Sequence, residues 1–267
     1  MIPEFSLVVG IDKKHLEQFS YTFPTWQKNK PSTLKHPIFI FYDQTQILCQ
    51  DIYQITNGHD VQVIPYPFDD IDYFYPYDGT RFTESQRCKM LSGFAYVASE
   101  YVETPYWLKI DTDVVAAGHD DWIDPKWFEQ NPAIVSHPWS FTKPPNQMML
   151  LDEWAEGREG FENTEPLNLI PKPEADRVGH KRIISWCGFF QTGFTRLCTR
   201  FARQPDGKFH MPCPSQDGYM WWAAARLGWP IERPNMKKHG WQQWNCMSNI
   251  EKHAKLALRT EVNDVLW

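Results

Sequence analysis

The stretch Tyr106-Trp107-Leu108-Lys109-Ile110-Asp111-Thr112-Asp113 joins an apolar run to two carboxylates near the middle of the chain. The run has the composition of a buried strand, and small apolar residues follow it from Val114 to Gly118. In open α/β sheets, ligands bind beyond the carboxyl ends of the strands. Two carboxylates placed there repel each other, and a hard divalent cation such as Mg²⁺ or Mn²⁺ compensates that repulsion. The stretch therefore predicts a metal site at Asp111 and Asp113.

A solvated turn is the other interpretation of these two aspartates, since Asp side chains often accept hydrogen bonds from nearby backbone N–H groups. The context favours the metal site, because a helix pattern leads into the strand. A capping box at Thr83–Gln86 predicts where that helix begins. Apolar residues then recur at steps of three and four, as on one face of a helix. They are Met90, Leu91, Phe94, Val97, Ala98 and Tyr101.

Earlier in the chain, short apolar runs alternate with a helix pattern. Strands are predicted at 5–11, 37–43 and 61–65, and an amphipathic helix pattern extends from Leu16 to Trp26. Strands that alternate with helices in this way are typical of β-α-β units and a parallel sheet. The first half of the chain therefore predicts an α/β fold.

The second half has a less regular pattern. Strands are predicted at 133–135 and at 182–186, which leads into Gly188-Phe189-Phe190. Helices are predicted at 147–155, 194–203 and 216–227, the last between a Ser215 cap and Gly228. Gly, Pro and charged residues gather between 157 and 181, which indicates a long loop. No internal repeat or domain boundary is evident, so we expect one domain over 1–267.

Composition excludes several classes of protein. The 267 residues are 42 % apolar and 22 % charged, as in ordinary globular proteins. The formal charge of −6 is unfavourable for a protein whose main partner is nucleic acid. Six cysteines without a C-x-x-C pair indicate reduced thiols, and the N-terminal residues lack the pattern of a signal peptide. No run of eighteen apolar residues occurs, so we expect a cytoplasmic protein without a membrane span.

Taken together, these motifs resemble the GT-A glycosyltransferases, which transfer a sugar from a nucleotide-sugar donor. The resemblance rests on the strands Phe5–Ile11 and Phe39–Asp43, the helix that carries Arg87 and Lys89, and the segment Lys109–Asp113. It extends over about the first 140 residues and is looser beyond them. It implies a Rossmann-like α/β fold with a mixed, mostly parallel central sheet flanked by helices. It also implies a nucleotide-sugar-binding half at 1–118 and an acceptor-binding half at 119–267.

The resemblance also implies roles for individual residues. Asp111 and Asp113 would hold Mn²⁺ or Mg²⁺ on the donor diphosphate, with Asp113 the more direct ligand. The donor would be a UDP-sugar or, as the second choice, a GDP-sugar, and the acceptor an unidentified hydroxyl. Further residues would contact the donor from the strand ends, the preceding helix and the D-x-D segment. They are Val9, Gly10, Ile11, Asp43, Arg87, Lys89 and Thr112.

Two C-terminal residues complete the site that the resemblance implies. Asp217, at a predicted helix start after Ser215, would be the general base that deprotonates the acceptor hydroxyl, which slightly favours inversion. Family members usually carry two acidic residues there, whereas this chain has Gln216 before Asp217. His239 would complete the metal shell. An Asp in a first helical turn is also stabilised by the exposed N–H groups, whatever its function.

Three other functions share features with this sequence. Phosphatases of the haloacid dehalogenase type also place D-x-D after a strand, but on the first strand and with a later G-D-x-x-x-D pair, which is missing here. A sugar nucleotidyltransferase would carry a Gly-rich first loop, where this chain has Val9-Gly10-Ile11-Asp12. A non-catalytic carbohydrate-binding relative would keep both D-x-D and aromatic residues, and donor hydrolysis separates it from an enzyme.

Overall fold

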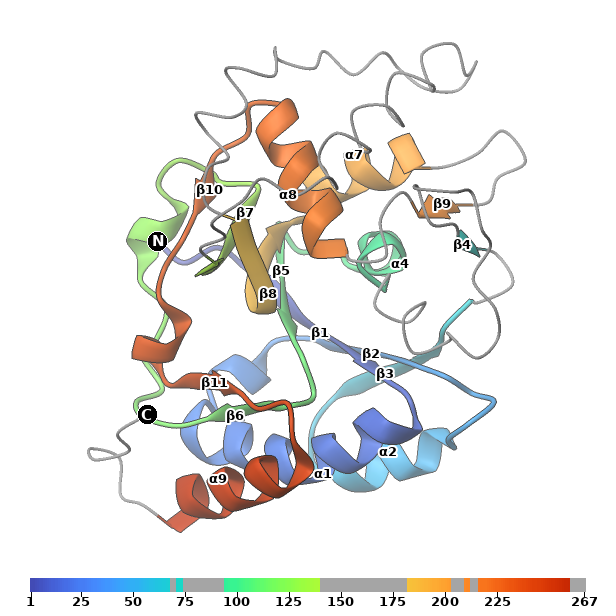
Figure 1. Cartoon of the computed structure of the whole chain (residues 1–267), viewed down its shortest axis with the longest axis vertical. Coiled ribbons are helices and arrows are strands. Elements are labelled where there is room, and N and C mark those ends of the chain that lie inside the picture. Colours follow the sequence, from blue (N-terminus) through green and yellow to red (C-terminus); the bar gives the residue numbers. More distant parts are fainter. Residues whose placement is uncertain (68–70, 74–93, 140–181, 203–208, 212–215, 260–267) are drawn as a thin grey trace.

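A seven-stranded sheet runs through the middle of the molecule (Figure 1). The computed structural model describes residues 1–67, 71–73, 94–139, 182–202, 209–211 and 216–259. The strands of the sheet are β1 (Phe5–Ile11), β2 (Ile38–Tyr42), β3 (Val61–Pro65), β5 (Tyr106–Ile110), β7 (Ile134–Trp139), β8 (Arg182–Gln191) and β10 (Ile231–Glu232). They lie in the order β10-β7-β8-β5-β1-β2-β3. The strands predicted from the sequence are all present.

The sheet is mixed but mostly parallel. β1 pairs in parallel with β2 and β5, β2 with β3, and β7 with β10. Among these seven described strands, only β8 runs against its neighbours, as the antiparallel partner of both β5 and β7. The carboxyl ends of β1, β2, β3 and β5 therefore meet at one edge, as the D-x-D motif requires. This topology confirms the predicted α/β class with a mixed, mostly parallel sheet.

Helices cover both faces of the sheet. Their bounds are α1 (Lys13–Asn29), α2 (Cys49–Ile55), α4 (Phe94–Tyr101), α7 (Thr192–Ala202), α8 (Gln216–Arg226) and α9 (Met247–Arg259). One core cluster joins α4, α7 and α8 to the sheet, and a second joins α1 and α2 to its other face. Figure 1 shows α9 beside α1, on the outer side of that second layer. The chain is thus a three-layer α/β sandwich.

Two small sheets were not predicted from the sequence. β6 (Val114–Ala116) pairs antiparallel with β11 (Trp241–Gln243), so the residues after the D-x-D are a strand held by a C-terminal strand. β4 (Ile71–Tyr73) pairs in parallel with β9 (Phe209–Met211). β8 is also longer than predicted, because it continues through Gly188 to Gln191. The predicted capping box at Thr83–Gln86, the helix at 147–155 and the loop at 157–181 lie outside the described residues.

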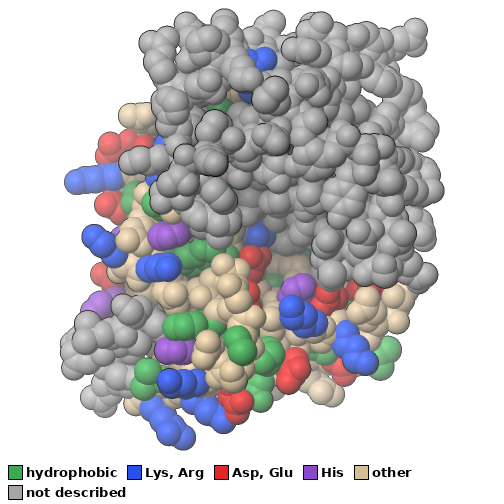
Figure 2. Space-filling view, viewed as in Figure 1, with side chains coloured by type: hydrophobic (Ala, Val, Ile, Leu, Met, Phe, Trp, Pro, Cys, Tyr) green, Lys and Arg blue, Asp and Glu red, His purple; other side chains and the backbone are tan. Residues whose placement is uncertain are grey.

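The described surface carries charges of both signs. On the face shown in Figure 2, acidic and basic side chains of the described residues are interspersed. No helix in the described part of the chain combines the length and the apolar character that crossing a bilayer requires. The four cysteines that the structure describes, Cys49, Cys187, Cys198 and Cys246, are free thiols.

Gly188 allows three strands to approach closely next to the D-x-D segment. It faces Lys109 of β5 and Ser136 of β7, and a Cβ atom there would lie 2.6 Å from Ser136 Oγ and 3.0 Å from the Val135 carbonyl oxygen. We therefore expect Gly188→Ala to lower the free energy of unfolding by about 1–3 kcal/mol, the usual cost of overpacking. Urea denaturation measures this change.

The matched control for that substitution is Gly193→Ala. A Cβ atom on Gly193, an exposed residue of α7, would meet nothing nearer than Gln191 Oε1 at 3.9 Å. This variant should unfold at the same urea concentration as the wild type or slightly above it, because alanine is the better helix former. Equal midpoints for Gly188→Ala and Gly193→Ala would contradict the packing argument.

Candidate functional site

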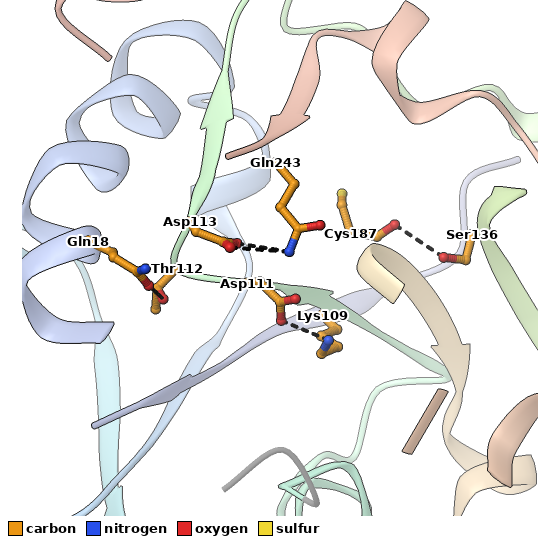
Figure 3. A network of polar contacts seen from close by, with 8 residues as sticks. All are labelled: Gln18, Lys109, Asp111, Thr112, Asp113, Ser136, Cys187 and Gln243. Carbon is orange, nitrogen blue, oxygen red and sulfur yellow. Dashed lines mark hydrogen bonds and ion pairs between the residues drawn. The ribbon is translucent and has the colours of Figure 1, made fainter. Parts of the chain in front are cut away.

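Asp111 and Asp113 lie in the tight connection between β5 and β6 (Figure 3). The Asp111 N–H donates to the Trp186 carbonyl of β8 over 2.8 Å, and the Val114 N–H donates to the Asp111 carbonyl over 3.2 Å. These bonds fix the backbone on both sides of the motif. The two carboxylates lie at the carboxyl end of β5, where ligands bind in open α/β sheets.

Helix α1 supports this connection from one side with polar side chains. The Thr112 hydroxyl donates to Gln18 Oε1 over 2.9 Å, and the Thr22 hydroxyl donates to the Thr112 carbonyl over 2.8 Å. The Trp26 indole N–H donates to the Val114 carbonyl over 2.7 Å. Thr112 is therefore buried against α1, on the other side of the backbone from the Asp113–Gln243 contact in Figure 3. Its side chain holds the loop and does not face the carboxylates.

The same helix satisfies the backbone of β6. The Thr25 hydroxyl accepts from the Ala116 N–H over 3.0 Å, and the Asn29 amide donates to the Ala116 carbonyl over 2.9 Å. Sequence reasoning did not find these supporting residues. The sequence feature that indicates them is a set of polar residues on the buried face of an amphipathic helix. Buried polar groups need hydrogen-bond partners, so such residues point to a neighbouring segment that they hold. The set is Gln18, Thr22, Thr25 and Asn29.

The two carboxylates have different surroundings. Lys109 is buried, and its Nζ lies 2.7 Å from Asp111 Oδ1. Asp113 instead accepts from the Gln243 amide, whose Nε2 lies 3.3 Å from Oδ1 and 3.2 Å from Oδ2. Burial and the nearby Asp111 charge raise the pKa of Asp113 to about 6. The ionised form of Asp113 is thus disfavoured in the metal-free protein, and a bound cation would stabilise it.

The residues present fit a hard divalent cation. Mg²⁺ is typically bound through one or two carboxylates, with water and substrate phosphates as its other ligands. Among the described residues no three His, Cys, Asp or Glu side chains come together as a metal-binding group, so the two aspartates are the acidic ligands available here. Burial, and then the Asp111 charge, hold the pKa of the Cys187 thiol well above its usual value. Its thiolate form is therefore disfavoured in the metal-free protein.

The predicted donor-binding residues of β1 lie at the same edge as the aspartates. Val9 and Ile11 are buried in the core, so they present only their backbone to that edge. β1 and β5 are paired up to Val8 and Lys109. Continuing that register places Gly10 beside Asp111. The end of β1 therefore lies beside the D-x-D, and contact of these β1 residues with a donor stays a prediction.

Asp43 is fully buried directly after β2 and organises the turn that follows. Its Oδ1 accepts from the Thr45 N–H over 3.1 Å and from the Thr45 hydroxyl over 2.7 Å, while Oδ2 accepts from the Gln46 amide over 2.7 Å. These bonds account for a carboxylate at this position. Contact between Asp43 and a nucleoside stays a prediction.

His239 does not join the two aspartates. It ends a short 3-10 helix at Met236–His239, and its ring packs edge-on against Trp127 with centroids 4.8 Å apart. Burial and the nearby Lys30 ammonium lower the pKa of His239. The C-terminal residue that reaches Asp113 is instead Gln243, which sequence reasoning missed.

Three further predicted site residues are Asp217, Arg87 and Lys89. Asp217 is the second residue of α8, as the predicted helix start requires, but its side chain lies outside what the structure describes. Arg87 and Lys89 lie outside the described residues altogether. Their contacts with a donor or an acceptor stay predictions.

Comparison with known proteins identifies the fold. No protein-family model matches the sequence, and no curated protein matches it. Among solved structures, core-mannan synthase A from Aspergillus fumigatus, in its Mn/GDP form, matches with a TM-score of 0.51 at 11 % identity, over 86 % of this chain and 70 % of that one. This chain has the GT-A fold.

Two further solved structures match the GT-A chain at lower scores. Mouse xyloside xylosyltransferase 1, in its apo form, has a TM-score of 0.49 at 7 % identity, over 86 % of this chain and 85 % of that one. The galactosyltransferase LgtC, in complex with donor and acceptor sugar analogs, has a TM-score of 0.48 at 12 % identity, over 85 % of this chain and 73 % of that one.

Proposed function

We propose that this chain is a glycosyltransferase that moves a sugar from a nucleotide-sugar donor to a hydroxyl acceptor, with a divalent cation held by Asp111 and Asp113. The observation that carries the proposal is the pair of carboxylates at the carboxyl end of β5 in a GT-A fold. The raised pKa of Asp113, caused by burial and by Asp111, supports a cation at this position. The Mn/GDP form of core-mannan synthase A is consistent with it.

The chemistry of donor cleavage accounts for this arrangement. When the anomeric C–O bond breaks, negative charge develops on the leaving nucleoside diphosphate, and a bound Mn²⁺ or Mg²⁺ would stabilise it as a Lewis acid. The chain contributes a carboxylate pair whose backbone is fixed by α1 and β8. Lys109 neutralises part of the charge on Asp111. Asp113 is therefore the more direct ligand in this proposal, with a UDP-sugar as the first donor to test and a GDP-sugar as the second.

Asp217 is the proposed general base, because it lies in the first turn of α8 within the proposed acceptor-binding half, 119–267. Asp217→Asn keeps the shape of the side chain but cannot take up the acceptor proton. We expect this variant to lose transfer to the acceptor while it still binds the donor nucleotide, and the wild-type product to have inverted anomeric configuration. A retained configuration, measured by NMR, would remove Asp217 from this role.

A panel of nucleotide sugars tests the proposed function directly. The protein is incubated with each donor and Mn²⁺, and release of nucleoside diphosphate is followed over time, with a chelator in the matched control. At least one UDP- or GDP-sugar should release its nucleotide only when the metal is present. Binding without release from any donor would favour a non-catalytic carbohydrate-binding protein. Release that is unaffected by the chelator would contradict the role of the metal.

A further inference from the structure

A C-terminal strand holds Asp113 by both its side chain and its main chain. Gln243 of β11 lies opposite Val114 of β6 and donates to both carboxylate oxygens of Asp113, which is 130 residues away in the sequence. The next N–H, that of Trp244, donates to the Asp113 carbonyl over 3.0 Å. The strand pairing thus fixes Gln243 at the carboxylate where the cation is proposed.

The amide group of Gln243 can interact with this site both without and with a bound cation. Its Nε2 is a donor, and its Oε1 is an acceptor with two lone pairs. In Figure 3 the Nε2 faces Asp113 and Oε1 points away from it. A half turn of the amide group exchanges the two atoms, so that Oε1 would take the place that Nε2 holds beside the aspartate oxygens. Amide oxygens belong to the hard ligands that suit Mg²⁺ and Mn²⁺.

We propose that Gln243 is a third protein ligand of the cation site, with its amide turned so that Oε1 faces the ion. This inference rests on the proposed function, because it assumes a cation at Asp113. The position of Gln243 supports it: the amide contacts both carboxylate oxygens of Asp113, and not the carboxylate of Asp111 that is paired with Lys109. His239, four residues earlier, packs against Trp127 instead.

A competing role for Gln243 makes the opposite prediction. If Nε2 only stabilises the metal-free carboxylate, it competes with the cation for the lone pairs of Asp113. Removal of the amide would then strengthen metal binding. If Oε1 is a ligand, removal of the amide weakens metal binding. The sign of the change in Mn²⁺ affinity therefore separates the two roles.

The test is Mn²⁺ binding to the whole protein without any nucleotide, measured by calorimetry and by the EPR signal of free Mn²⁺. Gln243→Met keeps an unbranched side chain of similar length without the amide, and we expect its dissociation constant to rise about tenfold or more. Gln243→Glu supplies an anionic oxygen at the same place and should bind Mn²⁺ at least as tightly as the wild type. His239→Ala is the matched control and should bind as the wild type does.

Each outcome supports or overturns one of the two proposals. If neither the wild type nor Asp113→Asn binds Mn²⁺, the proposed metal site is wrong, and the proposed role of Gln243 is wrong with it. If the wild type binds Mn²⁺ and Gln243→Met binds it equally or more tightly, only the Gln243 role is overturned. Should Gln243→Met fail to fold, as judged by circular dichroism, weaker binding by Gln243→Glu than by the wild type would overturn it.

Discussion

Asp113→Asn is expected to lower the rate of glycosyl transfer by about 10²–10³-fold, the usual loss when a principal electrostatic stabiliser is removed. The same substitution is expected to raise the melting temperature of the metal-free protein near neutral pH. The reason is that the ionised carboxylate is disfavoured by burial and by Asp111, which raise its pKa to about 6. If Asp113 served only to stabilise the fold, Asp113→Asn would lower the melting temperature instead.

The stability that Asp113→Asn gains over the wild type should increase with pH. The pKa of Asp113 is about 6 in the folded state, against an ordinary value of 3.8, so between these values the folded state binds more protons than the unfolded state. Stability contributed by Asp113 is therefore lost as pH rises through about 4 to 6. The wild type and Asp113→Asn should unfold alike at the acidic end of this window and separate towards its upper end. Urea denaturation at a series of pH values measures the difference.

Asp111→Asn is the control for that experiment, because Asp111 forms the ion pair with buried Lys109. Removing the Asp111 charge leaves the buried Lys109 ammonium without that partner, so this variant should lower the stability of the metal-free protein. Opposite stability changes in the two variants would distinguish the two carboxylates. If Asp113→Asn retained wild-type kinetics with the fold intact, the role of this residue in the proposed reaction would be refuted.

The fold and the position of the aspartates could be predicted because their signals are local. The apolar runs that become β1, β2, β3 and β5 are each continuous in sequence, and Asp111 directly follows the last of them. Parallel strands bring their carboxyl ends to one edge whatever the rest of the chain does. The two carboxylates could therefore be placed at that edge from the sequence.

The supporting strands β6 and β11 could not be predicted, because the partner of each strand is distant in the sequence. β6 and β11 have three residues each and are strands only through their pairing with each other. Gln243 has no motif of its own, and nothing local indicates that it reaches Asp113. Gly188 resembles a strand breaker, which explains the predicted strand end near Trp186. Its lack of a side chain is needed for the close approach of Ser136.

Binding of a nucleoside diphosphate with Mn²⁺ is expected to raise the melting temperature of the wild type by about 5–10 °C. A ligand that binds only the folded state, present at about 100 times its dissociation constant, adds about 2.7 kcal/mol to the free energy of unfolding. For a chain near this size, each kcal/mol raises the melting temperature by about 2–4 °C. The measurement needs no acceptor, so it tests the donor site by itself.

The metal dependence of this shift identifies the residues responsible. Asp111 and Asp113 are both anionic when ionised and repel a diphosphate, so they can hold it only through a divalent cation. The shift should therefore disappear with a chelator and in Asp113→Asn, whereas Asp217→Asn should keep it, because Asp217 is proposed to act on the acceptor. His239→Ala should also keep it, since His239 packs against Trp127 and away from the carboxylates. A full shift from UDP or GDP in the presence of a chelator would show that the nucleotide binds without the aspartate pair.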